Sequence, residues 1–179
     1  MSALVTDCSR ISVPTGALLR DLPNNGDTKM GKHEDADLIL KLYDLRREKV
    51  MREARNWFFT FNPTSIQDFM DTMVGENSAY YRMVVSYWDM AASLVNRGAI
   101  DEDMFNDSNG EIVFVYSKIA AFIPQLRETF GLPEMLQNME KLVKRIPNID
   151  EKIAQMNERM KQFSKLIEER MKGKAASGD

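Results

Sequence analysis

The chain has 179 residues, of which 44% are hydrophobic and 28% are charged, and its formal net charge is -3. This length suits one domain with its own core and an added arm, and the composition excludes a disordered chain. The small negative charge provides no general attraction to nucleic acid or to an anionic membrane, so a protein is the favoured class of partner.

The sequence shows no feature that would direct the chain out of the cytoplasm. Cys8 is the single cysteine, so no disulfide can form within the chain. The opening residues "MSALVTDCSRISVPTGALL" lack the apolar run of a secretory signal. The longest apolar stretch, residues 112–123, is shorter than a bilayer span. We therefore expect a cytoplasmic protein without a membrane partner.

The first 34 residues mix glycine and proline with polar residues and show no helical periodicity. Such a composition predicts a flexible or peripherally packed segment. From Asp35 onward, apolar residues recur at spacings of three and four, which predicts one helix running to about Phe59.

The next helix boundaries are indicated by capping residues. Asn62 and Pro63 predict the start of a short second helix, and Gly75 predicts its left-handed end. Asn77 and Gly98 bound a third helix in the same way.

The second half of the chain is also predicted to be helical. One helix is expected over about residues 111–130, with a kink or break near Ile123 because Pro124 cannot donate a backbone hydrogen bond. Gly131 marks its end, and a further helix is predicted over residues 133–145.

No segment shows the sustained alternation of a strand, so the predicted fold class is all-α. We expect an irregular bundle of five to seven helices, followed by an amphipathic C-terminal helix that could form a coiled coil. The predicted organisation is an N-terminal segment (1–34), a helical bundle domain (35–147), the C-terminal helix (148–172) and a polar tail (173–179).

The C-terminal helix carries the most regular apolar pattern of the chain. Its members step by alternating intervals of four and three, as in a heptad seam: Ile149, Ile153, Met156, Met160, Phe163 and Ile167. This helix could dock on its own bundle or pair with a second copy, and so short a seam does not decide between the two. The flanking residues supply no pattern of opposite charges, so a homodimer would be held by apolar contact.

The stretch "DSNGEI" has the spacing of the middle of an EF-hand calcium loop. With Gly110 at the sixth position of such a loop, Phe105 and Tyr116 fall at the first and twelfth positions. Both positions need a carboxylate, so the stretch is not expected to bind calcium.

A helix junction explains the same stretch better. Asp101 is expected to cap a turn, and Phe105 to fill the core beneath it. Ser108 or Asn109 is expected to cap the next helix.

Around this junction the sequence resembles a family of small helical bacterial domains of unknown function. The resemblance covers about residues 80–143 and rests on Trp88, Leu94, Gly98, Ile100, Asp101, Glu102, Phe105, Pro124, Arg127, Glu140 and Leu142. The chain departs from the family pattern at "NMEKL", where an aromatic residue before the glutamate is missing. The resemblance implies a helical fold and no particular activity.

Residues that could carry catalysis are scarce. The single histidine, His33, stands among charged residues ahead of the first helix, which excludes a multi-histidine metal site. Carboxylate pairs such as Asp44 with Glu48, or Asp101 with Asp103, have no sequence signal that they converge in an apolar pocket. We predict no catalytic residue, metal ligand or cofactor.

The first helix is rich in basic residues, namely Arg46, Arg47, Lys49, Arg52 and Arg55. Glu48 and Glu53 lie four residues from basic partners, a spacing typical of a solvated ion-pair face. Weak nucleic-acid binding through this helix is therefore an alternative function and not the expected one.

Four aromatic residues, Trp57, Phe58, Phe61 and Trp88, could fill the core or line a pocket between helices. A helical domain that binds a small apolar ligand there is the first alternative. The function that we favour is that of a non-catalytic module for protein interaction or self-association through the C-terminal seam.

Overall fold

The computed structural model describes residues 31–177, except for the side chains of residues 164, 167, 168 and 171–177. In chain order its helices are α1 (Lys32–Arg47), α2 (Lys49–Thr60), α3 (Ile66–Val74), α4 (Ser78–Asn96), α5 (Glu102–Ser108), α6 (Glu111–Ile119), the 3-10 helix η1 (Ala120–Phe122), α7 (Ile123–Phe130), α8 (Gln137–Val143) and α9 (Ile149–Ser177). These described residues contain no strand. The predicted all-α irregular bundle is therefore confirmed.

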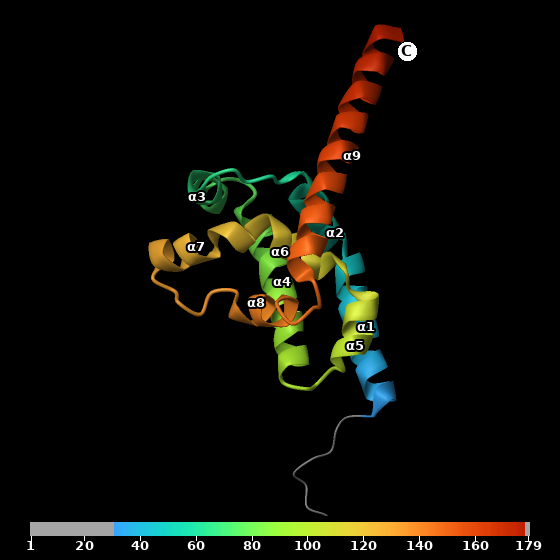
Figure 1. Cartoon of the computed structure of the whole chain (residues 1–179), viewed down its shortest axis with the longest axis vertical. Coiled ribbons are helices and arrows are strands. Elements are labelled where there is room, and N and C mark those ends of the chain that lie inside the picture. The colour runs from blue at the N-terminus through green and yellow to red at the C-terminus, as the bar shows by residue number, and fades with distance from the viewer. Residues whose placement is uncertain (1–30, 178–179) are drawn as a thin grey trace, which may run out of the picture.

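The helix α4 is the centre of the bundle (Figure 1). It packs against α2 and α8, and also contacts α3 and α5. Eight of its 19 residues are buried, among them Trp88, whose side chain is fully enclosed. Burial of apolar surface stabilises a fold by about 25 cal/mol per Å². The buried residues of α4 therefore make a large contribution to the stability of the core.

The predicted first helix is divided at Glu48, which was not expected. The backbone of Glu48 has ψ 141°, in the extended region, and its carboxylate accepts a hydrogen bond from the backbone N–H of Met51 at 2.9 Å. Glu48 therefore ends α1 and caps α2. Neither glycine nor proline marks this point, and the apolar periodicity continues across it. The sequence therefore predicted a single helix.

The helix α3 begins later than predicted. Its N-cap is Ser65, which forms a capping box with Asp68, whereas Asn62 and Pro63 lie in the preceding loop. Gly75 ends the helix as expected, but with φ -87° and ψ 178° it is extended and not left-handed. The prediction was wrong on both details. The start was misplaced because a second capping signal follows Pro63 within two residues.

Around Pro124 the chain changes helix type. The 3-10 helix η1 separates α6 from α7, and Pro124 occupies the first turn of α7, where a missing N–H costs nothing. The kink or break expected near Ile123 is present as this 3-10 segment. Gly131, at φ 63°, provides the left-handed end of α7.

The helix α8 is shorter than the predicted segment 133–145 and is capped by a neighbouring helix. Leu136 precedes it with φ 59°, a conformation that is costly for a residue other than glycine. Asp89 of α4 accepts a hydrogen bond from the backbone N–H of Met139 at 2.9 Å and one from the Asn138 amide at 3.1 Å. This carboxylate supplies the N-terminal cap that α8 itself lacks.

The last helix, α9, contacts α6 near its start and then extends away from the bundle (Figure 1). It is the longest helix of the chain, with 29 residues. No helix among the described residues is both long and apolar enough to cross a membrane.

Candidate functional site

The seam predicted on α9 is divided by the structure into a packed base and an exposed upper part. Ile149 is buried in the core, and Ile153 is partly buried against it. The other members are the half-buried Met156 and Met160, the exposed Phe163, and Ile167, whose side chain lies outside those described. The base of the seam thus holds α9 to its own bundle.

Beyond that base, large apolar side chains on α9 are open to solvent. Phe163 is 48% exposed and Leu166 is 58% exposed. Leu166 was not part of the predicted seam, but its exposure adds to the apolar surface beside it. Neighbouring large apolar residues on a projecting helix are typical of an interaction site.

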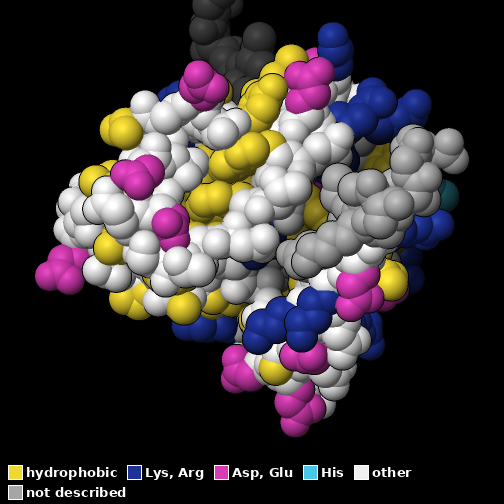
Figure 2. Space-filling model, turned by 90° about the horizontal axis from the view of Figure 1, so that it is seen from above, with side chains coloured by type: hydrophobic (Ala, Val, Ile, Leu, Met, Phe, Trp, Pro, Cys, Tyr) yellow, Lys and Arg dark blue, Asp and Glu magenta, His cyan; other side chains and the backbone are white. Residues whose placement is uncertain are grey.

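A groove lies between α9 and the bundle, and we name it the α9 groove. Its volume is about 490 Å³, within the range of small-molecule sites. It is lined by Asn62 and Pro63 of the α2–α3 loop, Phe114, Ser117 and Lys118 of α6, Ala121 and Phe122 of η1, and Asn157, Met160, Lys161 and Lys165 of α9. Figure 2 shows the face from which α9 projects, with hydrophobic side chains open at the surface and both basic and acidic side chains around them.

Lys118 connects the α9 groove to the end of α2. Its ammonium group donates to the backbone oxygens of Phe59 and Phe61, both at 2.7 Å, and lies 3.1 Å from the backbone oxygen of Phe58 and from the side-chain Oδ1 of Asn62. Lys118 thus supplies a donor to carbonyls at the C-terminal end of α2, where helices leave backbone oxygens without helical partners. Burial lowers the pKa of Lys118 to about 8, because the charged form loses hydration.

The aromatic residues predicted as a possible pocket pack against other side chains. Trp57 stacks on Phe61 with ring centroids 5.1 Å apart, and Phe58 lies 5.8 Å from Phe61. Trp88 instead packs edge-on against Tyr87 at 5.0 Å. Three of the four residues are therefore brought together, and Trp88 has a different neighbour.

A ligand-sized apolar cavity does occur elsewhere, along α4. It has a volume of about 490 Å³ and is lined mainly by apolar residues, among them Met73, Val85, Met90, Met135 and Leu136. None of the four predicted aromatic residues lines this cavity.

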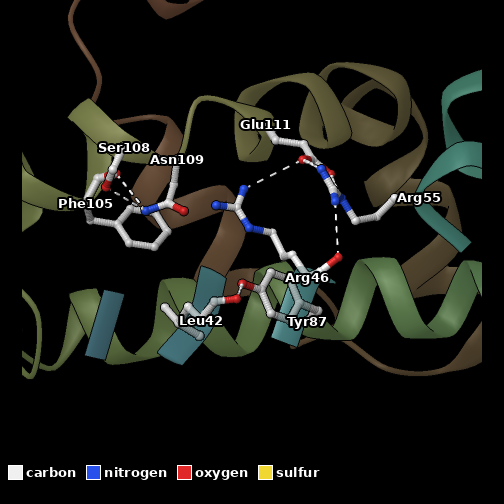
Figure 3. Close-up of polar contacts among 8 residues, drawn as sticks. All are labelled: Leu42, Arg46, Arg55, Tyr87, Phe105, Ser108, Asn109 and Glu111. Atoms are coloured by element: carbon white, nitrogen blue, oxygen red, sulfur yellow. Dashed lines mark hydrogen bonds and ion pairs between the residues drawn. The ribbon is translucent and has the colours of Figure 1, made fainter. Parts of the chain in front are cut away.

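A charged cluster joins α1, α2 and α6 beside α4 (Figure 3). Arg55 forms a two-pronged ion pair with Glu111, with Nε 2.7 Å from Oε1, and this hydrogen bond raises the pKa of Arg55. Arg46 is buried, lies 3.7 Å from the same carboxylate and stands over the ring of Trp88. Tyr87 closes the cluster by donating to the backbone oxygen of Leu42 at 2.7 Å.

This cluster corrects the prediction of a solvated basic face on the first helix. Arg46 and Arg55 point inward, while Glu48 and Arg52 bond to backbone at the α1–α2 junction. The sequence signal that was missed is the glutamate at the start of α6, 56 residues from Arg55.

The stretch with calcium-loop spacing is a helix junction, as predicted. The Asp101 carboxylate accepts from the backbone N–H of Met104 at 3.0 Å, and Phe105 is fully buried. Asn109 is also buried, but its amide donates back to the Phe105 oxygen at 3.1 Å and so ends α5 (Figure 3). The expectation that Ser108 or Asn109 caps α6 was wrong: Gly110 precedes α6 without a side-chain cap, because the Ser108 and Asn109 side chains donate back to α5. Within residues 31–177, no three His, Cys, Asp or Glu side chains are placed to hold a metal ion.

Several residues that carried the family resemblance meet in the structure. Arg127 and Glu140 form an ion pair at 2.7 Å that joins α7 to α8, and Lys144 and Arg127 lower the pKa of Glu140. Leu142 is fully buried. These positions maintain the packing of the bundle.

Comparison with known proteins separates the bundle from α9. A family model described as Domain of unknown function (DUF4760) matches residues 33–146, which end before α9. No curated protein and no solved structure matches the chain. The resemblance to a family of unknown function is confirmed. Because the match covers more than half of the sequence, the chain belongs to this DUF4760 family.

Proposed function

We propose that this protein is a non-catalytic, cytoplasmic interaction module that forms a homodimer through α9. The observation that carries the proposal is the pair of large apolar side chains on the projecting helix, Phe163 at 48% and Leu166 at 58% exposure. A second α9 would cover them together with the half-buried Met156 and Met160.

The two halves of the seam are suited to different tasks. Ile149 and Ile153 lie against the bundle and fix the direction in which α9 leaves it. The residues from Met156 onward continue the same apolar stripe away from the bundle, where a partner helix has access. Methionine in this stripe tolerates more than one packing arrangement, so the contact depends on area more than on close fit.

The charged residues of the bundle support a role without catalysis. Glu111 and Glu140 are occupied by arginine partners, and Asp89 and Asp101 by helix caps. Side chains held in this way serve structure, whereas an acid or base needs access to a substrate.

The inward direction of Arg46 and Arg55 counts against the nucleic-acid alternative. Arg46 is 9% exposed, so its charge cannot reach a phosphate. Of the basic side chains of this segment, Arg47, Lys49 and Arg52 are the exposed ones, and they are interleaved with acidic residues.

The proposal can be tested by light scattering on the full chain and two single substitutions. Phe163→Glu places a charge in the exposed half of the seam, and Gln155→Glu places the same charge on the polar face of the same helix. We expect the unsubstituted chain and Gln155→Glu to have twice the 20.6 kDa mass of the chain, and Phe163→Glu to be a monomer. Equal masses for all three proteins would contradict a dimer through the seam.

A further inference from the structure

The α9 groove combines positive charge with an apolar floor. Among its lining residues that the structure describes, three are lysines and none is acidic. The remaining surface includes the rings of Phe114 and Phe122 and the side chain of Met160. A groove with these properties matches a ligand that has an anionic end and an apolar body.

The lysines have two different roles in the groove. Lys118 already donates to carbonyl oxygens at the end of α2, so it contributes charge from below and no free hydrogen bond. Lys161 and Lys165 stand one helical turn apart on α9, and both are exposed. They can therefore turn toward a ligand head group at the rim of the groove.

The neutral lining residues suit the same kind of ligand. The amide of Asn157, and the second N–H of the Asn62 amide, whose first N–H donates to Thr60 O, can donate to an anion without charge repulsion. The Ser117 hydroxyl donates to the Phe114 backbone oxygen and only adds polar surface. Pro63 and Ala121 are small and apolar, which leaves room for a chain to lie between α9 and η1. The volume of about 490 Å³ is large enough for one acyl chain of moderate length.

We propose that the α9 groove binds a single-chain amphiphile with an anionic head, whose head group lies at Lys161 and Lys165 and whose chain lies on Phe114, Phe122 and Met160. This activity goes beyond the proposed homodimer. It uses the side of α9 that faces η1. Met160 belongs both to the seam and to the groove lining, whereas Phe163 and Leu166 do not line the groove. A bound anion also offsets the burial of the Lys118 charge.

The test is isothermal titration calorimetry of the full chain with dodecanoate, below the concentration at which it forms micelles. We expect one dodecanoate to bind per chain, with an affinity that falls as salt is added. Dodecyltrimethylammonium has the same chain with a cationic head and should bind at least about tenfold more weakly, which corresponds to about 1.4 kcal/mol.

Substitutions then locate the site. The double variant Lys161→Glu with Lys165→Glu should lose at least about tenfold in affinity. A matched control, Lys152→Glu with Arg159→Glu, makes the same charge change on α9 at residues that do not line the groove, and should bind as the unsubstituted chain does. Ala121→Trp should block the chain site while leaving both lysines in place.

Three outcomes would overturn the proposal: no binding of dodecanoate, equal binding of the cationic amphiphile, or equal losses in the two double variants. Phe163→Glu separates this proposal from the homodimer. It should abolish dimer formation and retain dodecanoate binding, so the failure of one proposal is distinguishable from the failure of the other.

Discussion

At the scale of single residues, the most informative group is Glu111 with its two arginines. Arg46 is buried between the rings of Tyr43 and Trp88, 5.3 Å from each ring centroid, and Arg55 binds the same carboxylate. A buried positive charge needs a nearby negative or hydrogen-bonding partner, because water cannot reach the site to hydrate the charge. Glu111 therefore fixes the position of α6 against α1 and α2.

Removing this carboxylate should be costly. Glu111→Gln leaves two arginines near each other without a counter-charge. We expect the free energy of unfolding to fall by about 2 kcal/mol. This is less than the cost of breaking a fully buried ion pair, because the Glu111 cluster is partly exposed to solvent. Urea denaturation would measure it. The control Glu102→Gln breaks the surface pair with Arg145 and should cost about 0.5 kcal/mol or less. Equal losses would show that the Glu111 cluster has no special role.

Two buried tyrosines predict how stability depends on pH. Burial raises the pKa of Tyr87 to about 12, and it raises that of Tyr81 further. Between the ordinary pKa of 10 and these values, tyrosines ionise in the unfolded chain but not in the folded one. In this pH range the folded state binds more protons than the unfolded state. The free energy of unfolding is therefore highest below pH 10 and falls as the pH rises above it.

The variant Tyr81→Phe isolates this effect, since the Tyr81 hydroxyl has no hydrogen-bond partner among the described residues. The variant should be nearly as stable as the unsubstituted chain at neutral pH. Its loss of stability between about pH 9 and pH 11 should be smaller by about 1.4 kcal/mol. In the folded chain Lys118 has a pKa of about 8, and its contribution is the same in both proteins. Parallel stability curves would contradict the assignment.

At the scale of helices, two glycines differ in whether their backbone conformation requires glycine. Gly131 has φ 63° and Gly110 has φ -57°, and an added Cβ would meet no atom within 4 Å at either. Gly131→Ala should lose about 1 kcal/mol through backbone conformation alone. Gly110→Ala should gain about 0.4 to 1 kcal/mol by restricting the unfolded chain. Thermal unfolding of both variants would contradict this account if their melting temperatures moved in the same direction.

The helices themselves could be predicted from sequence, while several of their ends could not. Periodicity identified the helical segments, and Gly98, Pro124 and Gly131 acted as expected because their effect is local. The break at Glu48 and the position of α8 depend on distant groups. Glu48 leaves the helix without a local breaker, and α8 takes its cap from Asp89 of α4.

The candidate sites show the same limit. The seam of α9 could be predicted because one helix carries it. The α9 groove could not, since Lys118 and Lys161 are far apart in sequence and the α2–α3 loop completes the lining. Lys118 was visible only as a charge inside the apolar stretch 112–123, a pattern that fits a snorkelling residue as well as a site.

At the scale of the whole molecule, the family match and the proposed function concern different parts of the chain. The match to residues 33–146 covers the bundle, in which Trp88, Phe105 and Leu142 are fully buried. Such residues preserve a scaffold. The surfaces we propose for binding lie on α9, beyond the matched residues, so the activity of this chain would depend on what α9 adds to the scaffold.

Self-association through α9 can be tested by sedimentation equilibrium of the full chain over a range of protein concentrations. We expect a mass that rises from 20.6 kDa toward twice that value, with a midpoint in the micromolar range typical of contacts that bury few large side chains. A mass that stays at 20.6 kDa at every concentration would contradict it.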